Sequence, residues 1–359
     1  MQDAFSQSYA QARGKFLHAA DAAGLSVESH LHPLPGRDGE TLAMDVVREG
    51  PVDARNLLIV SSACHGVEGY CGSGVQVNAL RDKAWREAAR AQKVAIVYIH
   101  GLNPYGFSHI RRVTHENVDL NRNFQDYNQP LPVNEAYREI EPLLLPEVWP
   151  PNASNAQATA QFIAQHGMVG LQAAVTRGQH QYPDGMFFGG TSATWSNLTL
   201  RQVLQQHARQ TQRLAWIDLH TGLGPSGVGE RIFACADDAA AYARARDWWG
   251  PKITSIYDGS STSAFLTGLM WMAAYQECPQ AEYTGLALEY GTQPMDKVMM
   301  ALRGEHWLHN HPHASADLKA QIKQDLMDAF YTDTDEWRTQ ILAQAQDAMH
   351  QAVRGLSQA

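Results

Sequence analysis

Four short, uninterrupted apolar runs constrain the fold of this chain more than any other feature. They are Leu57–Val60, Val94–Ile99, Leu214–Ile217 and Leu286–Leu288. Such runs are typical of strands that are buried on both faces of a sheet. The stretches with helical periodicity that separate them are 72–91, 158–175, 196–207 and 237–249. This alternation predicts an α/β fold with a mixed, mainly parallel central sheet flanked by helices.

Segments at both ends of the chain add to this sheet. An amphipathic pattern over 3–23 predicts a helix, and the apolar stretches 27–34 and 41–47 flank a Pro-Gly-Arg-Asp-Gly turn and predict an antiparallel hairpin. Apolar residues at i, i+4 spacing predict helices that pack on the core over about 315–359. We therefore expect a single domain over 1–359, with a helix-hairpin extension over about 1–50. The prolines in 142–155 predict an irregular connection and no domain boundary.

The composition excludes several classes of protein. Hydrophobic residues make up 44% of the chain and charged residues 18%, which is the balance of an ordered globular protein. A formal charge of -9 argues against binding of nucleic acid. The chain has no apolar run of signal-peptide or transmembrane length, so we expect a cytoplasmic protein without a membrane partner. Its four cysteines form no C-x-x-C pattern, and we expect buried thiols. No feature indicates an oligomeric state.

A histidine and a glutamate lie just beyond the first apolar run. His65 and Glu68 are spaced i, i+3 on a turn, so both can face one metal ion. His220 lies in the same position after the third run, and catalytic zinc usually takes three protein ligands and keeps one position open. We predict that these three residues bind one Zn2+ ion, although the ligand types also suit other divalent ions. Taken singly, His65 could be a core residue and Glu68 a charge at a helix N-terminus.

Glu289 directly follows the fourth apolar run. In open α/β sheets, ligands bind beyond the carboxyl ends of the strands, so we expect Glu289 in the same crevice as the metal ligands. A carboxylate beside a zinc site can take the proton of a water molecule, and Glu289 is the predicted general base. A salt bridge is the other interpretation of this residue.

A second polar cluster spans residues 111–124. Asn121 and Arg122 can hold an anionic substrate, because the rigid guanidinium fork suits a carboxylate. Arg112 can polarise a carbonyl group, and its neighbour Arg111 is an alternative for that role. Asp119 is the expected acceptor that orients the imidazole of His65. The stretch 115–119 differs from the helical zinc motif H-E-x-x-H, because its fifth residue is an aspartate.

Three further features of the sequence bear on the function. The four histidines in 306–313 are expected at an exposed helix end, in preference to an adventitious metal site. No G-x-S-x-G elbow and no phosphate-binding loop is present, which argues against a serine hydrolase and a nucleotide-binding protein. Five aromatic residues can line an apolar pocket or belong to the core: Tyr182, Phe187, Phe188, Trp195 and Trp271.

Taken together, the chain resembles the zinc carboxypeptidase superfamily, which includes carboxypeptidase A-like peptidases and the aspartoacylase and succinylglutamate desuccinylase deacylases. The matching motifs, in the order of the family, are His65-Gly-Val-Glu68, Asp119-Leu-Asn-Arg-Asn-Phe124, Asp218-Leu-His220 and Leu288-Glu-Tyr290. The likeness is greatest to a bacterial branch that is labelled as a domain of unknown function, and it covers almost the whole chain. The resemblance implies one metallocarboxypeptidase-like catalytic domain.

By position, the resemblance also implies residue roles. His65, Glu68 and His220 match the zinc ligands, and Glu289 matches the general base and acid. Arg112 matches the residue that stabilises the oxyanion, although Arg111 could replace it, and Asn121 with Arg122 matches the pair that grips the substrate carboxylate. Three tyrosines are weak candidates for the substrate-capping tyrosine of the digestive enzymes: Tyr182, Tyr257 and Tyr290.

We therefore predict a zinc-dependent amide hydrolase that cleaves a peptide or peptide-like bond next to a free carboxylate. An N-acyl amino acid deacylase is the alternative, because both enzymes would use every residue named above. A non-catalytic zinc-binding protein is the alternative from another class, and loss of Glu289 or Arg122 would have favoured it. Both residues are present.

Overall fold

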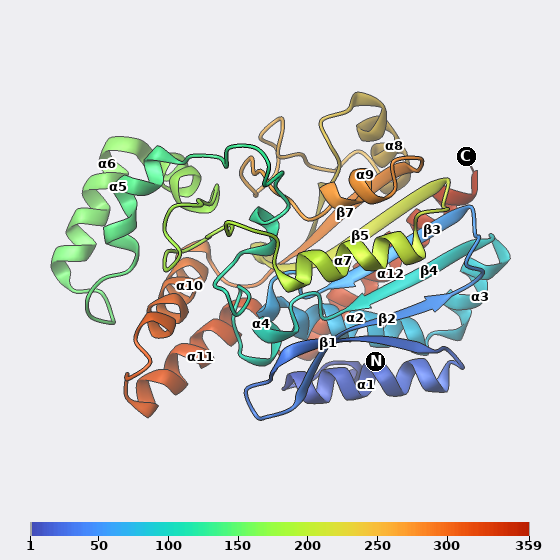
Figure 1. The fold of residues 1–359 in the computed structure, drawn as a ribbon, viewed down its shortest axis with the longest axis horizontal. Coiled ribbons are helices and arrows are strands. Elements are labelled where there is room, and N and C mark those ends of the chain that lie inside the picture. Colours follow the sequence, from blue (N-terminus) through green and yellow to red (C-terminus); the bar gives the residue numbers. More distant parts are fainter. Residues whose placement is uncertain (1, 359) are drawn as a thin grey trace.

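One seven-stranded sheet organises the computed structural model, which describes residues 2–358 (Figure 1). The strands are β1 (Val27–Pro35), β2 (Thr41–Glu49), β3 (Asn56–Ser62), β4 (Val94–His100), β5 (Arg213–Ser226), β6 (Gly229–Phe233) and β7 (Glu282–Gly291). Their order across the sheet is β1-β2-β4-β3-β5-β7-β6.

The centre of the sheet is parallel and its edges are antiparallel. The four apolar runs form β3, β4, β5 and β7, which pair in parallel with one another. The hairpin β1–β2 extends one edge and β6 extends the other, all through antiparallel pairs. The predicted mixed, mainly parallel sheet is therefore confirmed.

Helices cover both faces of this sheet. The bounds are α1 (Tyr9–Ala22), α2 (Gly69–Arg81), α3 (Lys83–Ala91), α4 (Pro104–Ser108), α5 (Glu135–Leu144), α6 (Ala153–Thr176), α7 (Trp195–His207), α8 (Ala239–Trp249), α9 (Met272–Glu277), α10 (Met295–Asn310), α11 (Ala316–Phe330) and α12 (Asp335–Gln358). Helices α2, α3, α8 and α12 form one layer, and α7 lies over the other face (Figure 1). Beyond the carboxyl ends of the parallel strands, α5 and α6 form a lobe, with α10 and α11 beside it (Figure 1).

Two predicted segments differ in detail. The helix predicted over 72–91 is broken at Asp82, whose side chain accepts a hydrogen bond from the backbone N–H of Trp85 and so caps a new helix, α3. In the predicted irregular stretch 142–155, α5 runs on through Pro142 to Leu144, and the irregular part is limited to 145–152. The short edge strand β6 was not predicted.

Helix α10 was missed as an element, and this changes the interpretation of the histidine run. His306 lies within α10 and is only 4% exposed, with its Nε2 atom 2.8 Å from the backbone oxygen of Asp184. The prediction of an exposed helix end is therefore wrong for His306. His309 and His313 are exposed near the end of the helix.

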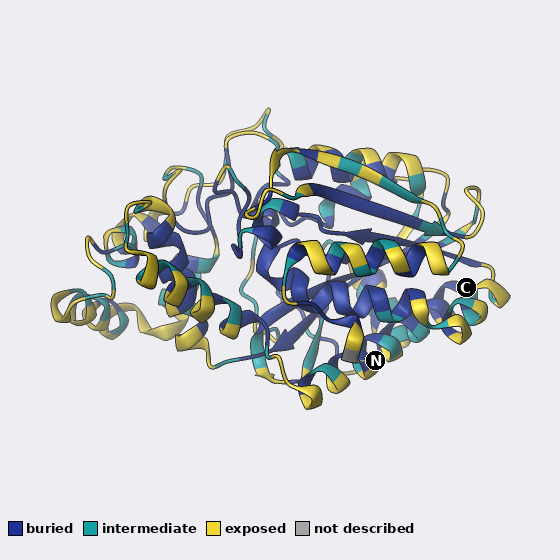
Figure 2. Ribbon diagram, turned by 90° about the horizontal axis from the view of Figure 1, so that it is seen from below, coloured by how far each residue is buried: buried dark blue, intermediate teal, exposed yellow. Residues whose placement is uncertain are grey.

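Buried residues are concentrated in the sheet and on the inner faces of its helices, whereas the α5–α6 lobe is largely exposed (Figure 2). All four cysteines are buried and free, as expected. Among the described residues, no helix has the length and the apolar character needed to cross a membrane.

One glycine sets how closely two loops approach at the carboxyl edge of the sheet. Gly66 lies between His65 and Glu68, and a Cβ atom at this position would lie 2.0 Å from the backbone carbon of Gly106. Its N–H donates to the carbonyl oxygen of Arg112, and the N–H of Val67 donates to that of Arg111. The turn that carries His65 is thus hydrogen-bonded directly to the arginine loop.

Substitution Gly66→Ala should destabilise the fold, because the contact that it creates is with rigid backbone. Overpacking of this kind costs about 1–3 kcal/mol or more in unfolding free energy. Gly14→Ala in α1 is a matched control, since a Cβ atom there meets nothing within 4 Å. The control should be neutral or slightly stabilising. Urea unfolding of the two variants tests this, and equal midpoints would contradict it.

Candidate metal centre and active site

The sheet brings the predicted site residues to one edge. His65 follows β3, His220 lies in β5 and Glu289 lies in β7. In the register of β5 and β7, His220 is paired directly with Glu289, so the two side chains leave the same face of the sheet side by side. Glu68 ends the short 3-10 turn Gly66–Glu68 at the start of α2.

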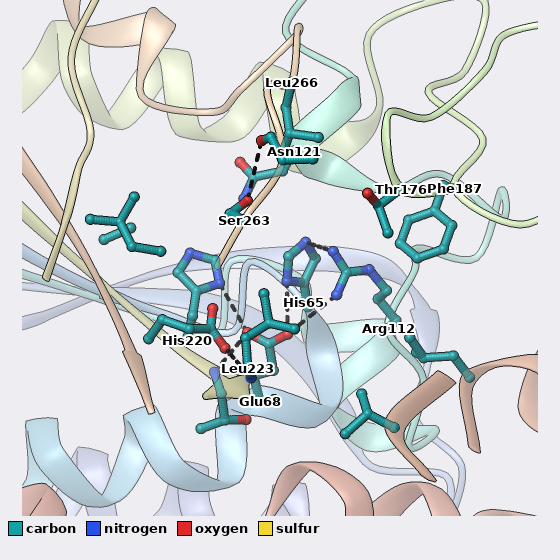
Figure 3. A pocket seen from close by; sticks show the side chains of 18 of the residues that line it. His65, Glu68, Arg112, Asn121, Thr176, Phe187, His220, Leu223, Ser263 and Leu266 are labelled. Atoms are coloured by element: carbon teal, nitrogen blue, oxygen red, sulfur yellow. Dashed lines mark hydrogen bonds and ion pairs between the residues drawn. The ribbon is translucent and has the colours of Figure 1, made fainter. Parts of the chain in front are cut away.

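Two imidazoles and one carboxylate face a common centre (Figure 3). His65 Nδ1 lies 2.8 Å from Glu68 Oε1, and His220 Nδ1 lies 2.9 Å from Glu68 Oε2. One ligand atom from each residue lies within 4.8 Å of the others, and all three side chains are buried. Ligand atoms around one tetrahedral zinc ion are about 3.3 Å apart, as follows from zinc–ligand distances of about 2.0 Å. The spacing of this cluster is compatible with that geometry.

The far nitrogen of each imidazole meets a buried carboxylate. His65 Nε2 lies 3.2 Å from Asp119 Oδ1, and His220 Nε2 lies 2.5 Å from Asp218 Oδ2. A carboxylate that accepts a hydrogen bond from the Nε2–H group leaves the lone pair of Nδ1 facing the centre, which is how metal-binding histidines are usually oriented. The donor set and its supporting carboxylates therefore fit a divalent metal such as zinc.

Asp218 is the functional candidate that the sequence analysis did not assign. Ser61 Oγ donates to Asp218 Oδ1 at 2.5 Å, and the indole N–H of Trp216 donates to Ser61 Oγ at 2.7 Å. Residues 218 and 220 lie two apart on one strand and so point to the same face. The Asp-x-His spacing on a predicted strand was the available signal.

Opposite charges hold this cluster in its ionised form. Burial would raise the pKa of Glu68, but His65 and His220 lower it well below its usual value. Burial likewise would lower the pKa of His220, but Asp218 and Glu68 raise it well above its usual value. The centre therefore favours an ionised Glu68 carboxylate between the two imidazoles.

The two neighbouring arginines point to different surroundings. Arg112 lines the cavity next to the centre; its Nε donates to Asp119 Oδ2 at 2.9 Å, and its Nη2 lies 2.8 Å from His65 Nε2. Arg111 instead donates to Glu305 at 2.8 Å and to Asn117 at 3.1 Å. Of the two candidates for the oxyanion role, only Arg112 lies in the cavity.

The loop that carries Arg112 is strained and firmly held. Ile110 has a φ of 51°, which is unfavourable for a β-branched side chain. Lys323 of α11 donates to the carbonyl oxygens of His109 and Ile110 at 2.8 and 3.0 Å, and to Glu305 at 2.8 Å. Interactions with the C-terminal helices thus fix the backbone just before the two arginines.

Asn121 and Arg122 also line the cavity. Asn121 Oδ1 accepts from the backbone N–H of Met270 at 3.0 Å, so this carbonyl oxygen is occupied. The guanidinium of Arg122 donates to the carbonyl oxygens of Thr176 and Arg177 at the end of α6. Burial lowers the pKa of Arg122 to about 10, which still leaves the group charged at neutral pH.

The surroundings of Glu289 favour the uncharged form of its carboxyl group. Its Oε1 atom accepts from the backbone N–H of Leu223 at 3.0 Å, and the side chain is 8% exposed. Burial and the nearby charge of Glu68 raise the pKa of Glu289 to about 8. A carboxyl group tuned in this way can exchange a proton near neutral pH.

The cavity that joins these groups has a volume of about 110 Å³. Of the five aromatic candidates, Phe187 and Trp271 line it, whereas Tyr182, Phe188 and Trp195 do not. The ring of Phe187 lies 5.2 Å from the guanidinium carbon of Arg112 and 5.8 Å from that of Arg122. Among the described residues, no tyrosine lines this cavity, and the side-chain hydroxyls of Tyr257 and Tyr290 bond to backbone oxygens elsewhere.

A family described as "Protein of unknown function (DUF2817)" matches residues 5–344. The chain belongs to this family. No curated protein matches the sequence of this DUF2817 member.

One solved structure shows the same fold, and two further matches are weaker. Bovine thrombin-activatable fibrinolysis inhibitor, in complex with tick carboxypeptidase inhibitor, is 10% identical, with a TM-score of 0.51, and the match covers 99% of this chain and 98% of that one. A metallo-carboxypeptidase from Pseudomonas aeruginosa, in complex with (2-guanidinoethylmercapto)succinic acid, is 13% identical, with a TM-score of 0.39 and coverage of 90% and 69%. One from Burkholderia cenocepacia is 12% identical, with a TM-score of 0.40 and coverage of 90% and 68%. The predicted membership of a family of unknown function is therefore confirmed by the family match, and the α/β fold is confirmed by the first of these structures.

Asp218→Asn should lower zinc affinity by about 10–100-fold. The reason is that a neutral amide oxygen accepts the hydrogen bond from the Nε2–H group of His220 more weakly than a carboxylate does. Competition with a chromophoric chelator measures the effect. Asp258→Asn is a matched control, since Asp258 is exposed and lies outside the cavity. Unchanged affinity in Asp218→Asn would remove this aspartate from the metal centre.

The pKa of Glu289 predicts a pH dependence of stability in protein treated with a chelator. The folded pKa of about 8 is above the ordinary glutamate pKa of 4.5, so between these pH values the folded chain binds a proton that the unfolded chain has lost. The free energy of unfolding should fall as the pH rises through this window. Glu289→Gln should remove this loss, and its stability relative to wild type should increase by on the order of 3 kcal/mol between pH 5 and pH 8. Urea unfolding at the two pH values measures the difference, and a constant difference would contradict the assignment.

Proposed function

We propose that this protein is a zinc-dependent amide hydrolase, and more specifically a metallocarboxypeptidase that cleaves a peptide or peptide-like bond next to a free carboxylate. The observation that carries the proposal is the convergence of His65, Glu68 and His220 on one centre beside Glu289. A bound zinc ion would supply Lewis-acid activation of water and carbonyl groups. His65, Glu68 and His220 would hold it.

Glu289 acts as the proton carrier of the reaction. Its carboxylate takes a proton from the attacking water and returns it to the leaving amine. Protonation of the amine makes it a better leaving group. Glu289 thus serves first as a base and then as an acid.

Two arginines have separate tasks. Arg112 lies beside His65 and donates a hydrogen bond to the oxygen that becomes negative as water adds to the carbonyl carbon. Arg122 and the side-chain amide of Asn121 hold the free carboxylate of the substrate on the other side of the cavity. The scissile bond is placed between these two positions.

An N-acyl amino acid deacylase is the second candidate. The residues that line the cavity suit an acyl amino acid as well as the end of a peptide. Both substrates present an amide next to a carboxylate, so both use the same residues. A non-catalytic zinc-binding protein would have no need of a buried carboxyl group with a pKa near neutrality.

Glu289→Gln should keep the metal and lower the turnover of any substrate by at least about 100-fold, since general acid–base catalysis contributes about 10²–10⁴-fold. Metal content by mass spectrometry and product release from peptides and N-acyl amino acids measure both properties. Asp258→Asn serves as the control with wild-type turnover. Wild-type activity in Glu289→Gln would exclude Glu289 as the base.

His220→Ala should lose zinc, because only two of the three ligands remain. The control is His313→Ala, which removes an exposed histidine from the end of the run after α10. A fully metallated and active His220→Ala variant would remove His220 from the ligand set.

A further inference from the structure

We infer that the substrate carries a single carboxylate and is apolar on both sides of the scissile amide. This inference rests on the proposed function and adds the class of substrate to it. It follows from which side chains share the cavity with the metal centre and from which charges are missing there.

On the first side, the sheet itself supplies an apolar floor. Ala287 and Glu289 are two apart on β7 and therefore point to the same face. Ile232 of β6 is paired directly with Ala287, so it lies beside Ala287 on that face. Both residues line the cavity. A group placed next to Glu289 on this side therefore meets a small and a branched apolar side chain.

The carboxylate clamp is built into the wall of the same side. Asn121 Oδ1 accepts from Met270, and the adjacent residues Leu269 and Trp271 line the cavity. Gly268 packs so tightly that a Cβ atom there would lie 2.4 Å from the backbone oxygen of Arg122. The residue whose carboxylate is held by Asn121 and Arg122 thus has its side chain next to the apolar segment 269–271.

On the second side, helix α10 supplies the wall. Val298, Met299 and Leu302 line the cavity, together with Phe330 of α11 and Phe187. Val298 and Leu302 are spaced i, i+4 and so lie on one face of the helix. The acyl portion of the substrate therefore also meets apolar side chains.

The distribution of charge limits what else can bind. Among the described residues that line the cavity, the arginines are Arg112 and Arg122, and the carboxylates are Glu68 and Glu289. Each of these has a role in the proposed reaction. A second carboxylate on the substrate, as in an aspartyl or succinyl group, has no further arginine or lysine to pair with.

A basic side chain on the substrate would also find no free carboxylate among the described residues that line the cavity. Glu230 is paired with Glu289 in the register of β6 and β7, but its oxygens accept from Thr254 and Thr262. It does not line the cavity. An unpaired charge in a buried site is costly, so both acidic and basic side chains are disfavoured.

The test compares substrates that differ at one group. N-benzoylglycyl-leucine, -lysine and -aspartate vary the first side, and N-acetyl-leucine and N-succinyl-leucine vary the second. Product release by zinc-loaded protein should be at least about 10-fold faster for leucine than for lysine or aspartate, and for acetyl than for succinyl. Faster release from a lysine, aspartate or succinyl substrate would overturn the inference.

Binding separates this inference from the proposed function. Calorimetry with metal-loaded Glu289→Gln measures the affinity for the same compounds without turnover. The wild-type protein could fail to cleave every compound while Glu289→Gln still binds leucine compounds more tightly than lysine or aspartate compounds. In that case the proposed function fails and the inference stands. Equal affinities, or no binding of any compound, would overturn the inference.

A matched pair of variants locates the selectivity. Leu266 lines the cavity from a half-buried loop, whereas the neighbouring Phe265 is 50% exposed and does not line it. Leu266→Asp should shift the leucine-to-lysine ratio of affinities by at least about 10-fold toward lysine, because it adds a carboxylate to the wall. Phe265→Asp should leave the ratio unchanged. An unchanged ratio in Leu266→Asp, or an equal shift in both variants, would overturn the proposed position of the side-chain pocket.

Discussion

The rest of the site depends on the hydrogen bonds that the buried carboxylate of Asp119 makes. It lies 3.2 Å from His65 Nε2, accepts from Arg112 Nε at 2.9 Å and accepts from the backbone N–H of Asn121 at 2.9 Å. Burial would raise its pKa, but Arg112 and Arg122 hold it well below the usual value. One buried anion therefore fixes an imidazole of the metal centre, the arginine beside it and the start of the carboxylate clamp. Any shift of Asp119 would move all three together.

The balance of buried charge explains why this site suits a divalent cation. The described core of the site contains four buried acidic residues, Glu68, Asp119, Asp218 and Glu289, against the buried Arg122 and the partly buried Arg112. Four negative and two positive charges leave a formal charge of -2 before the imidazoles are counted, and protonation of His220, whose pKa is raised well above its usual value, offsets part of it. The protein relieves part of this excess by protonating Glu289, whose pKa is about 8. A divalent cation would neutralise the excess and free Glu289 to act as a base.

The sequence predicts the sheet well because burial on both faces leaves a simple apolar signal in β3, β4, β5 and β7. It also names the residues that meet at the carboxyl edge, since parallel strands end on one side. It could not assign Asp218 or separate Arg111 from Arg112. Those distinctions depend on partners far along the chain, namely Ser61 in β3 and Glu305 in α10. The N-cap at Asp82 was missed because the helical pattern continues across it from 72 to 91. The edge strand β6 was missed because it is only five residues long.

The period of two along a strand links chemistry to selectivity in this protein. On β7, Glu289 carries the proton, and Ala287, two residues before it, forms the floor of the cavity. On β5, His220 faces the metal centre, and Asp218, two residues before it, contacts its imidazole. The same alternation that places a catalytic group on the face of the sheet therefore decides what stands next to it. A larger residue at 287 would reach into the space beside Glu289, and a shorter partner at 218 would release His220. Substrate specificity is thus most easily changed on β6 and on the loop 255–271, where the apolar residues Ile232 and Leu266 line the cavity.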